Sequence, residues 1–137
     1  MRGKFIMSDD ADAHVMEWGR LGWLSNPAVT GAKQMTVIAG TFSPGYGHTF
    51  HYHPAQEEVI YVLAGCLEHW NEHEKRILGP GDCVFIPVGL VHASFNAGTD
   101  DARVLAILGP CVGDIGVEQV DVSGEAPWNA LRAERPD

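Results

Sequence analysis

Residues 45–65 read GYGHTFHYHPAQEEVIYVLAG, and this stretch decides the fold. Its first half, HTFHYH at 48–53, is expected to form a strand that ends before Pro54, because proline cannot donate to a β-ladder. Its second half, EEVIYVLAG at 57–65, is rich in β-branched and aromatic residues and predicts a longer strand. The intervening residues predict a turn, so the stretch indicates two consecutive strands.

The same pattern of short strands and turns continues along the chain in both directions. The 137 residues include 16 glycines and 8 prolines, which favour many tight connections over long helices. The pattern predicts an all-β single domain at 15–137, a sandwich or barrel, after a mobile acidic leader at 1–14. Further strands are expected at 34–42, 83–87, 91–96, 102–109 and 117–122, with a hairpin over 66–78 and a short helix at 127–133.

The strand at 57–65 is apolar on both of its sides, with Ile60 and Val62 alternating with Val59, Tyr61 and Leu63. A strand of this kind is buried on both faces. One face would line a barrel. The other would be covered by another sheet or by a second copy of the chain, and we therefore expect a homodimer.

The composition excludes several classes of partner. Eighteen acidic and nine basic side chains give a net charge of −9, which disfavours nucleic acid and anionic membrane surfaces as partners. No segment approaches the roughly 20 apolar residues of a membrane span, and the N-terminus lacks the apolar core of an export signal. Three cysteines without a CxxC pair argue against a disulfide framework. These features predict a cytoplasmic protein that binds a small molecule.

Four side chains indicate a metal site. His51 and His53 are two residues apart on an expected strand and should point to the same face. Glu58 follows after a turn, and His92 would come from a distant strand. Three imidazoles and a carboxylate suit one divalent transition metal (Fe, Mn, Ni, Cu or Zn) better than Ca or Mg. A buried carboxylate without a basic neighbour also needs a cation.

At these residues the sequence resembles the cupins. The first cupin motif, G(X)5HXH(X)3,4E(X)6G, matches 45–65, and the second, G(X)5PXG(X)2H(X)3N, matches 81–96. The resemblance implies a double-stranded β-helix, or jelly-roll barrel, that holds the metal inside. It also implies Glu58 as the ligand rather than Glu57, since only Glu58 leaves six residues before Gly65. One or two coordination positions would stay open to water or substrate.

The other histidines, the cysteines and the tryptophans are mostly expected to have structural roles. His48 has the opposite parity to His51 and is expected to face outward. His69 and His73 are expected to flank a solvated hairpin tip, with a second metal site there as the less favoured alternative. Cys66 and Cys83 are expected to pack rather than react. The four tryptophans are expected in the core or an interface. Candidates to orient the metal ligands are Tyr46, His48, Thr49, Gln56, Ser94 and Asn96.

The expected function is that of a metal-dependent enzyme. The His3Glu set resembles that of quercetinase-type dioxygenases and oxalate-active cupins, which implies an oxidoreductase, with Glu58 as a candidate base. The same site could instead serve as a Lewis acid for isomerase, lyase or decarboxylase chemistry. A non-catalytic cupin that binds a sugar or metabolite is a further alternative, and a structural role is a third. Fold alone does not decide among them.

Overall fold

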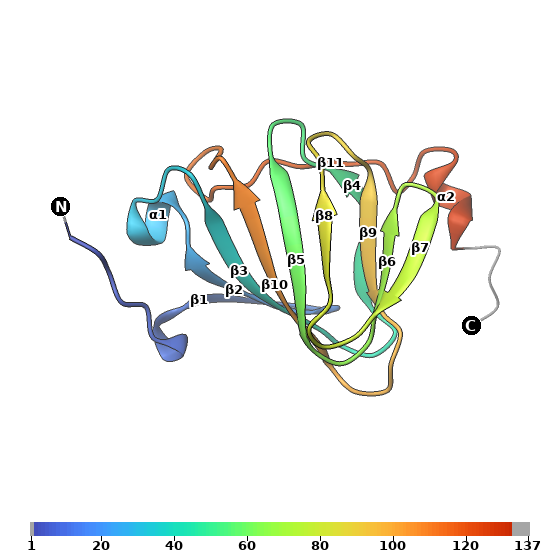
Figure 1. Ribbon diagram of the computed structural model, residues 1–137, viewed down its shortest axis with the longest axis horizontal. Coiled ribbons are helices and arrows are strands. Elements are labelled where there is room, and N and C mark those ends of the chain that lie inside the picture. The colour runs from blue at the N-terminus through green and yellow to red at the C-terminus, as the bar shows by residue number, and fades with distance from the viewer. Residues whose placement is uncertain (1, 133–137) are drawn as a thin grey trace.

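A computed structural model describes residues 2–132 as two antiparallel sheets that face each other (Figure 1). The larger sheet has the order β1-β2-β3-β10-β5-β8, and the smaller has the order β11-β4-β9-β6-β7. This is the expected all-β jelly-roll barrel. The strands are β1 (Asp12–Met16), β2 (Gly19–Ser25), β3 (Thr36–Phe42), β4 (Gly47–Tyr52), β5 (Glu57–Ala64), β6 (Leu67–Asn71), β7 (Glu74–Leu78), β8 (Cys83–Ile86), β9 (His92–Asn96), β10 (Ala102–Gly109) and β11 (Val120–Asp121).

Within residues 2–132, helical structure is confined to three short elements: η1 (Ser8–Asp10), α1 (Pro27–Thr30) and α2 (Trp128–Leu131). The expected helix at 127–133 is therefore present in a shorter form, and its last residue lies outside the described part of the chain. The side chain of Asn26 accepts a hydrogen bond from Val29 N and caps α1. No helix within 2–132 is long and apolar enough to cross a bilayer.

The hairpin β1–β2 was not expected from the sequence. It begins within the expected leader and adds two strands to one edge of the larger sheet, where β2 pairs with β3. The alternation of apolar and polar residues that predicts a strand is weak in this segment because glycines interrupt it. The hairpin turn is fixed by Ser43 N, which donates to the carbonyl oxygen of Trp18 at 3.0 Å.

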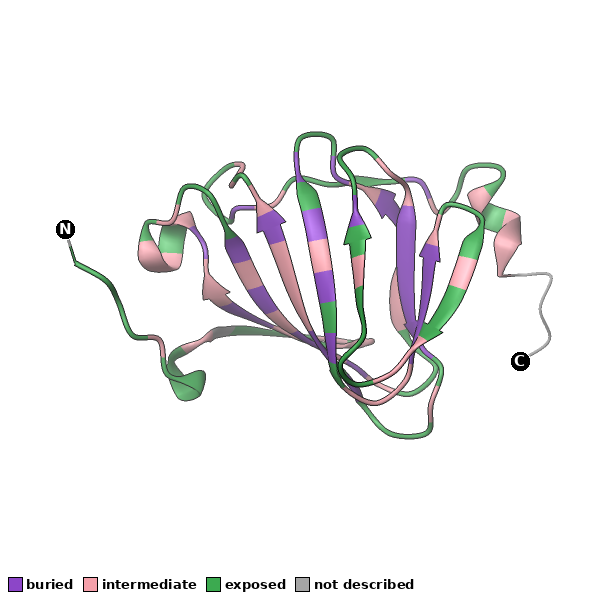
Figure 2. Ribbon diagram, in the orientation of Figure 1, coloured by how far each residue is buried: buried purple, intermediate pink, exposed green. Residues whose placement is uncertain are grey.

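The two sides of β5 point to opposite faces of the sheet as the sequence predicts, but only the inner side is buried within the described chain. Ile60 and Val62 are buried between the sheets, whereas Tyr61 and Leu63 on the outer side are 40% and 38% exposed. Figure 2 shows this alternation along β5. The outer face of the larger sheet is thus not covered by another part of the described chain.

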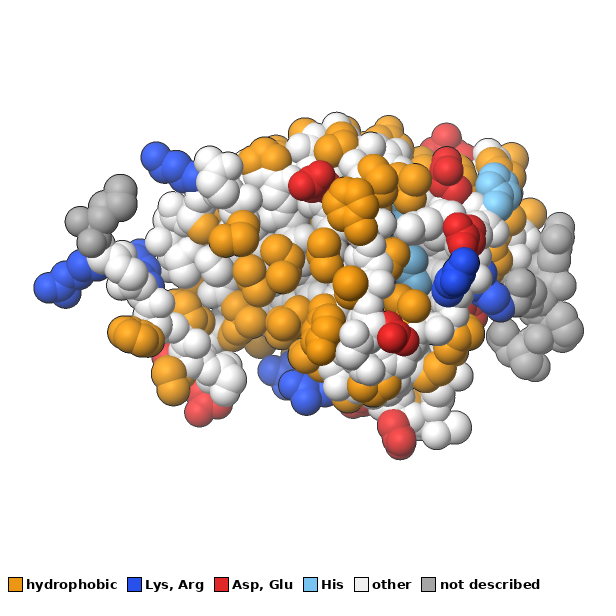
Figure 3. All heavy atoms as spheres, in the orientation of Figure 1, with side chains coloured by type: hydrophobic (Ala, Val, Ile, Leu, Met, Phe, Trp, Pro, Cys, Tyr) orange, Lys and Arg blue, Asp and Glu red, His pale blue; other side chains and the backbone are white. Residues whose placement is uncertain are grey.

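The smaller sheet is covered on its outer face by the C-terminal segment. Phe50, Trp70 and Phe95 pack there against Trp128, and Arg132 lies over the ring of Phe95 at 3.7 Å from its centroid. Arg132 also donates to Glu68 Oε2 at 2.8 Å. The two sheets therefore differ: the smaller one is covered on its outer face, whereas no part of the described chain covers the outer face of the larger one (Figure 3).

The turn between β5 and β6 requires a glycine. Gly65, the last residue of the first motif, has φ of +84°. A Cβ at this position would also lie 2.7 Å from the carbonyl oxygen of Asp101. Both facts exclude a side chain there.

Candidate metal centre

The structure brings together the four side chains that the sequence singles out. His51 is the next-to-last residue of β4, His53 follows that strand, Glu58 lies on β5 and His92 begins β9. All four are buried. The three histidines each offer one ligand atom, and these atoms lie within 4.8 Å of one another. Strands from both sheets therefore converge on one point in the interior.

Backbone carbonyls fix the orientation of all three imidazoles. Each Nδ1 lies within hydrogen-bond distance of a carbonyl oxygen: His51 at 2.6 Å from Thr49, His53 at 3.0 Å from Glu118, and His92 at 2.9 Å from Leu90. A carbonyl oxygen only accepts, so each Nδ1 carries the proton. Each Nε2 then keeps a free lone pair, which is the tautomer that binds a metal.

The atoms that face one another at the centre lack partners. Glu58 Oε1 lies 3.1 Å from both His53 Nε2 and His92 Nε2. Within residues 2–132, none of these three buried atoms forms a hydrogen bond of acceptable geometry. Unpaired lone pairs that face each other in a buried site are costly unless a cation lies between them. The donor set thus fits a divalent transition metal.

The pKa shifts of Glu58 and His53 also indicate that this site favours a positive charge. Burial alone would raise the pKa of Glu58, but contact with His53 and His92 outweighs burial and lowers it. Burial likewise opposes protonation of His53, but the Glu58 carboxylate outweighs it and raises the pKa of His53. Without a metal, a proton is drawn to this point instead.

The prediction that His48 faces outward is wrong. Its ring stacks on that of His51, with centroids 3.8 Å apart, and lines the central cavity. The register between β4 and β9 shifts between His48 and His51. Such an irregularity breaks the two-residue alternation on which the prediction depended. Burial lowers the pKa of His48 to about 4.

The prediction of a solvated His69 is also wrong. His69 lies on β6 and is buried, with Nδ1 2.9 Å from Ser94 Oγ and Nε2 2.8 Å from Asn71 Oδ1. The amide oxygen of Asn71 only accepts, so Nε2 carries the proton and Nδ1 accepts from the Ser94 hydroxyl. Burial lowers the pKa of His69 to about 4. By contrast, His73 is exposed, at the hairpin tip as expected.

Of the other candidates for orienting the ligands, Gln56 acts indirectly and Asn96 does not act on a ligand. Gln56 is buried and donates to the carbonyl oxygens of Pro110 and Gly116, while its Oε1 accepts from Glu118 N. It thereby fixes the segment whose carbonyl holds His53. Asn96 donates to Phe42 and Asp100 and stabilises a turn instead. Tyr46 is exposed.

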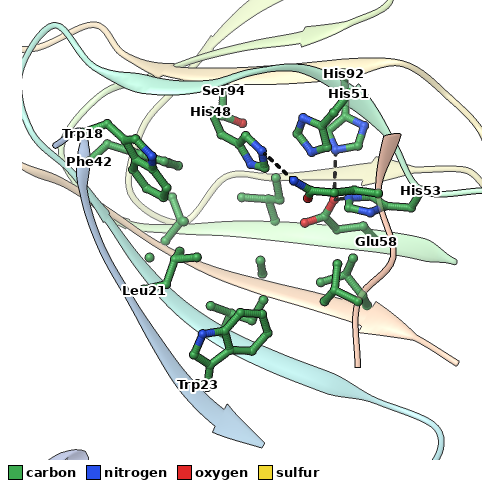
Figure 4. Close-up of a pocket in the computed structure, with 18 of the residues that line it drawn as sticks. Trp18, Leu21, Trp23, Phe42, His48, His51, His53, Glu58, His92 and Ser94 are labelled. Carbon is green, nitrogen blue, oxygen red and sulfur yellow. Dashed lines mark hydrogen bonds and ion pairs between the residues drawn. The ribbon is translucent and has the colours of Figure 1, made fainter. Parts of the chain in front are cut away.

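The four candidate ligands lie at one side of a cavity of about 420 Å³ (Figure 4). The volume is within the range of small-molecule sites. The walls are apolar and include Trp18, Trp23 and Phe42. No Lys or Arg lines this cavity within the described residues, and its only carboxylate is Glu58. The polar groups therefore gather at the histidines, with Ser94 and Gln119 beside them.

The tryptophans divide between two environments, and the cysteines are free. Trp18 and Trp23 line the cavity, which the sequence did not indicate, whereas Trp70 on the smaller sheet and Trp128 in the C-terminal segment belong to one cluster on the outer face of that sheet. Cys83 is exposed, and Cys66 is half-buried. Neither cysteine lines the cavity.

Comparisons with known proteins place these features in a family. The model of the cupin domain matches residues 39–108, about half of the chain. The protein SchB of Streptomyces halstedii is 28% identical over 91% of this chain and 94% of its own length. The polyketide synthase CurC of Streptomyces cyaneus is 29% identical over 97% of this chain and 86% of its own. The polyketide cyclase RemF of Streptomyces resistomycificus has the same fold, with a TM-score of 0.73, 22% identity, and coverage of 98% of this chain and 95% of its own.

Proposed function

The chain belongs to the cupin family, and from that premise we propose that it is a metal-dependent enzyme that acts on a small, uncharged, largely apolar molecule. In this proposal His51, His53, Glu58 and His92 hold one divalent transition ion. The observation that carries the proposal is the set of three unpartnered buried atoms, on Glu58, His53 and His92, beside an apolar cavity.

The cavity favours a substrate without charge. A phosphate or a free carboxylate is usually recognised by Arg or Lys, and neither lines this cavity within residues 2–132. Aromatic walls at Trp18 and Phe42 suit the flat faces of a conjugated or aromatic molecule. A substrate of this kind would place its oxygens near the histidines and its rings against the tryptophan wall.

The relatives support a reaction on a polyketide-type substrate. Two are described as a polyketide synthase and a polyketide cyclase. A bound divalent ion would supply a Lewis acid that polarises a carbonyl and acidifies the neighbouring C–H. The chain's own contribution would be a dry, shaped cavity, orientation of the substrate by the apolar wall, and Glu58, released from the ion, as the acceptor of the C–H proton. We therefore favour ring closure by aldol addition, in which the deprotonated carbon forms a C–C bond to a second carbonyl carbon of the substrate and that carbonyl oxygen takes the proton from Glu58.

Oxygen insertion is the second candidate. The donor set of three histidines and a carboxylate supports it, because that set also suits iron, manganese, nickel and copper. The metal that co-purifies separates the two reactions. Oxygen consumption with a flavonol or diketone would favour a dioxygenase, whereas turnover of a linear polyketone without oxygen would favour the cyclase.

The test begins with elemental analysis of protein purified without a histidine tag. We expect about one equivalent of metal in the wild type and its loss in His92→Ala. The matched control is His73→Ala, which removes an exposed histidine outside the site and should keep the metal. A wild-type site that stays empty after iron, manganese, nickel, copper and zinc are added back would overturn the proposal. Metal binding without turnover would favour a binding protein.

A further inference from the structure

Of the described residues that line the central cavity, only Ser94 carries a hydroxyl group. It lies on β9 in register with His48 on β4 and with His69 on β6, so these three residues form one row across the smaller sheet. Ser94 and His48 line the cavity next to each other (Figure 4), whereas His69 does not line it. Ser94 therefore lies between the cavity and a buried histidine.

The hydrogen bonds of His69 fix the direction of the Ser94 hydroxyl proton. Asn71 Nδ2 donates to the carbonyl oxygen of Phe85 at 3.3 Å, which leaves Asn71 Oδ1 to accept from His69 Nε2 at 2.8 Å. His69 is buried and both of its ring nitrogens face neutral partners, so the imidazole is neutral and Nδ1 accepts. The Ser94 hydroxyl thus donates to Nδ1 at 2.9 Å.

We propose that Ser94 Oγ is the hydrogen-bond acceptor for a hydroxyl group of the ligand, and that it selects a phenol, enol or alcohol at this position. A serine hydroxyl has one proton and two lone pairs, and here the proton is used within the protein. Among residues 2–132, His69 is the hydrogen-bonding partner of Ser94 Oγ, so lone pairs are left for the ligand. This inference rests on the proposed uncharged ligand of the cavity.

The position of Ser94 relative to the candidate metal ligands defines the ligand further. Ser94 is two residues from His92 on β9, and this separation places them on the same face of the strand, roughly 7 Å apart. The aromatic wall at Trp18 and Phe42 suits a flat ring beside them. A ligand with one oxygen at the candidate metal ligands would thus present a second oxygen, across a ring, to Ser94.

A ligand with only an acceptor at this position should bind poorly. A carbonyl or ether oxygen would set its lone pairs against those of Ser94 Oγ. If the Ser94 proton turned to such a ligand instead, the buried His69 Nδ1 would lose its donor, which is costly. A site built to hydrogen-bond a hydroxyl group therefore rejects analogues that lack it more strongly than an apolar wall rejects a change in size.

The test measures dissociation constants of matched naphthols by calorimetry on metal-loaded protein. The donor probe is 2,7-dihydroxynaphthalene. Its counterpart is 7-fluoro-2-naphthol, in which fluorine is close in size to a hydroxyl group but cannot donate. We expect the wild type to bind the donor probe at least about ten-fold more tightly. Ser94→Ala should remove this preference, whereas Ser94→Thr, which keeps a hydroxyl group, should retain it.

A second probe tests the direction of the hydrogen bond. The methyl ether 7-methoxy-2-naphthol only accepts at the position of interest. In His69→Phe the Ser94 proton loses its acceptor and can turn to the cavity, so this ether should bind about five-fold more tightly than to the wild type. The control is 2-naphthol, which has no group at that position and should bind both proteins alike. A purely structural role of the two residues would not favour the ether.

Equal binding of the donor probe and its fluorinated counterpart to the wild type would overturn the proposal, and this comparison needs no variant. A preference that Ser94→Ala leaves unchanged, or no binding of the donor probe at millimolar concentration, would also overturn it. Ether binding that stays the same or weakens in His69→Phe would contradict the assigned direction of the Ser94 proton, and with it the acceptor role. Circular dichroism confirms that each variant is folded.

Metal-free protein separates this inference from the proposed function. Its probes are 2-naphthol and 2-fluoronaphthalene, since no metal then holds the first hydroxyl group. A chain that takes up no metal, yet prefers 2-naphthol in a way that Ser94→Ala removes, would overturn the metal-dependent function and support the acceptor role of Ser94. A chain that binds metal but shows no preference in either pair of probes would overturn the acceptor role alone.

Discussion

The imidazole of His48 lies face to face with that of His51, with centroids 3.8 Å apart and ring planes 15° apart. Behind it, Trp18 is parallel to His48 within 8°. His48 thus supports the ring of a candidate metal ligand through packing. We predict that His48→Phe keeps the metal affinity and that His48→Ala lowers it about ten-fold, as loss of supporting contacts commonly does.

A competition titration with a chelator measures these affinities. Equal and nearly complete loss of metal in both variants would mean that His48 is itself a ligand.

The contact between His69 and Ser94 predicts a coupled effect on stability. Ser94→Ala leaves the buried His69 Nδ1 without a donor, which costs about 1–3 kcal/mol. His69→Phe leaves the Ser94 hydroxyl without its acceptor, at a similar cost. The double variant should be less destabilised than the sum of the two, since the residues share one hydrogen bond. Urea unfolding measures all three, and strict additivity would contradict the contact.

The apolar wall predicts ligand selectivity. Trp18 packs against Phe42, with ring centroids 5.3 Å apart, at the cavity. Trp18→Ala should weaken binding of an uncharged fused-ring phenol about ten-fold, because aromatic contacts contribute about 0.5–1.5 kcal/mol beyond area burial. Trp18→Phe should retain most of the affinity.

Calorimetry on metal-loaded protein provides the measurement. A small dicarboxylate such as oxalate, which reaches only the metal, serves as the control and should bind all three proteins alike. Unchanged phenol binding in Trp18→Ala would show that the ligand does not use this wall.

The pair Glu68–Arg132 predicts a loss of stability in acid. Burial opposes ionisation of Glu68, but Arg132 and the Trp70 indole outweigh burial and lower its pKa. A lowered folded-state pKa stabilises the protein above the unfolded-state pKa of about 4.3, and this stability is lost as the pH falls through the folded value. Glu68→Gln should therefore flatten the decline in melting temperature below about pH 4.5. An unchanged pH profile would show that the pair does not contribute.

Metal binding should weaken in mild acid. The pKa of His53 is raised in the metal-free protein, so a proton competes with the metal for Nε2 at a higher pH than for an ordinary histidine. Metal affinity should be highest when the pH is above the raised pKa of His53, and it should decrease as the pH falls below that pKa. Isothermal titration at several pH values, with the number of protons released, measures this. A metal affinity that stayed constant from pH 8 to pH 5.5 would contradict it.

The sequence predicted an all-β domain because its short-range strand patterns, such as those of β5 and β8, are clear. The jelly-roll barrel and the four converging side chains were predicted from the resemblance of 45–65 and 81–96 to the two cupin motifs, since His92 is distant from the other three in sequence. The features that the sequence did not predict depend on local irregularities in the strands. The register shift in β4 changed the side to which His48 points, and parity alone cannot show such a shift.

The hairpin tip gives a second example. Glu72 adopts a positive φ of 53° next to His73, so the turn is tight and His69 falls within β6 rather than at the tip. The hairpin β1–β2 was missed because Gly19 and Gly22 weaken the alternation on which a strand prediction depends. The pairing of His69 with Ser94 spans 25 residues, a distance at which sequence spacing gives no guide.

The hairpin β1–β2 supplies Trp18, Leu21 and Trp23 to the cavity, yet it lies entirely before residue 39, where the match to the family model begins. His51, His53, Glu58 and His92 all lie within that match. The apolar wall of the cavity therefore includes side chains from outside the family match, whereas the four candidate ligands lie inside it. Exchange of this N-terminal hairpin between relatives should change the shape of the wall and leave the candidate ligands in place.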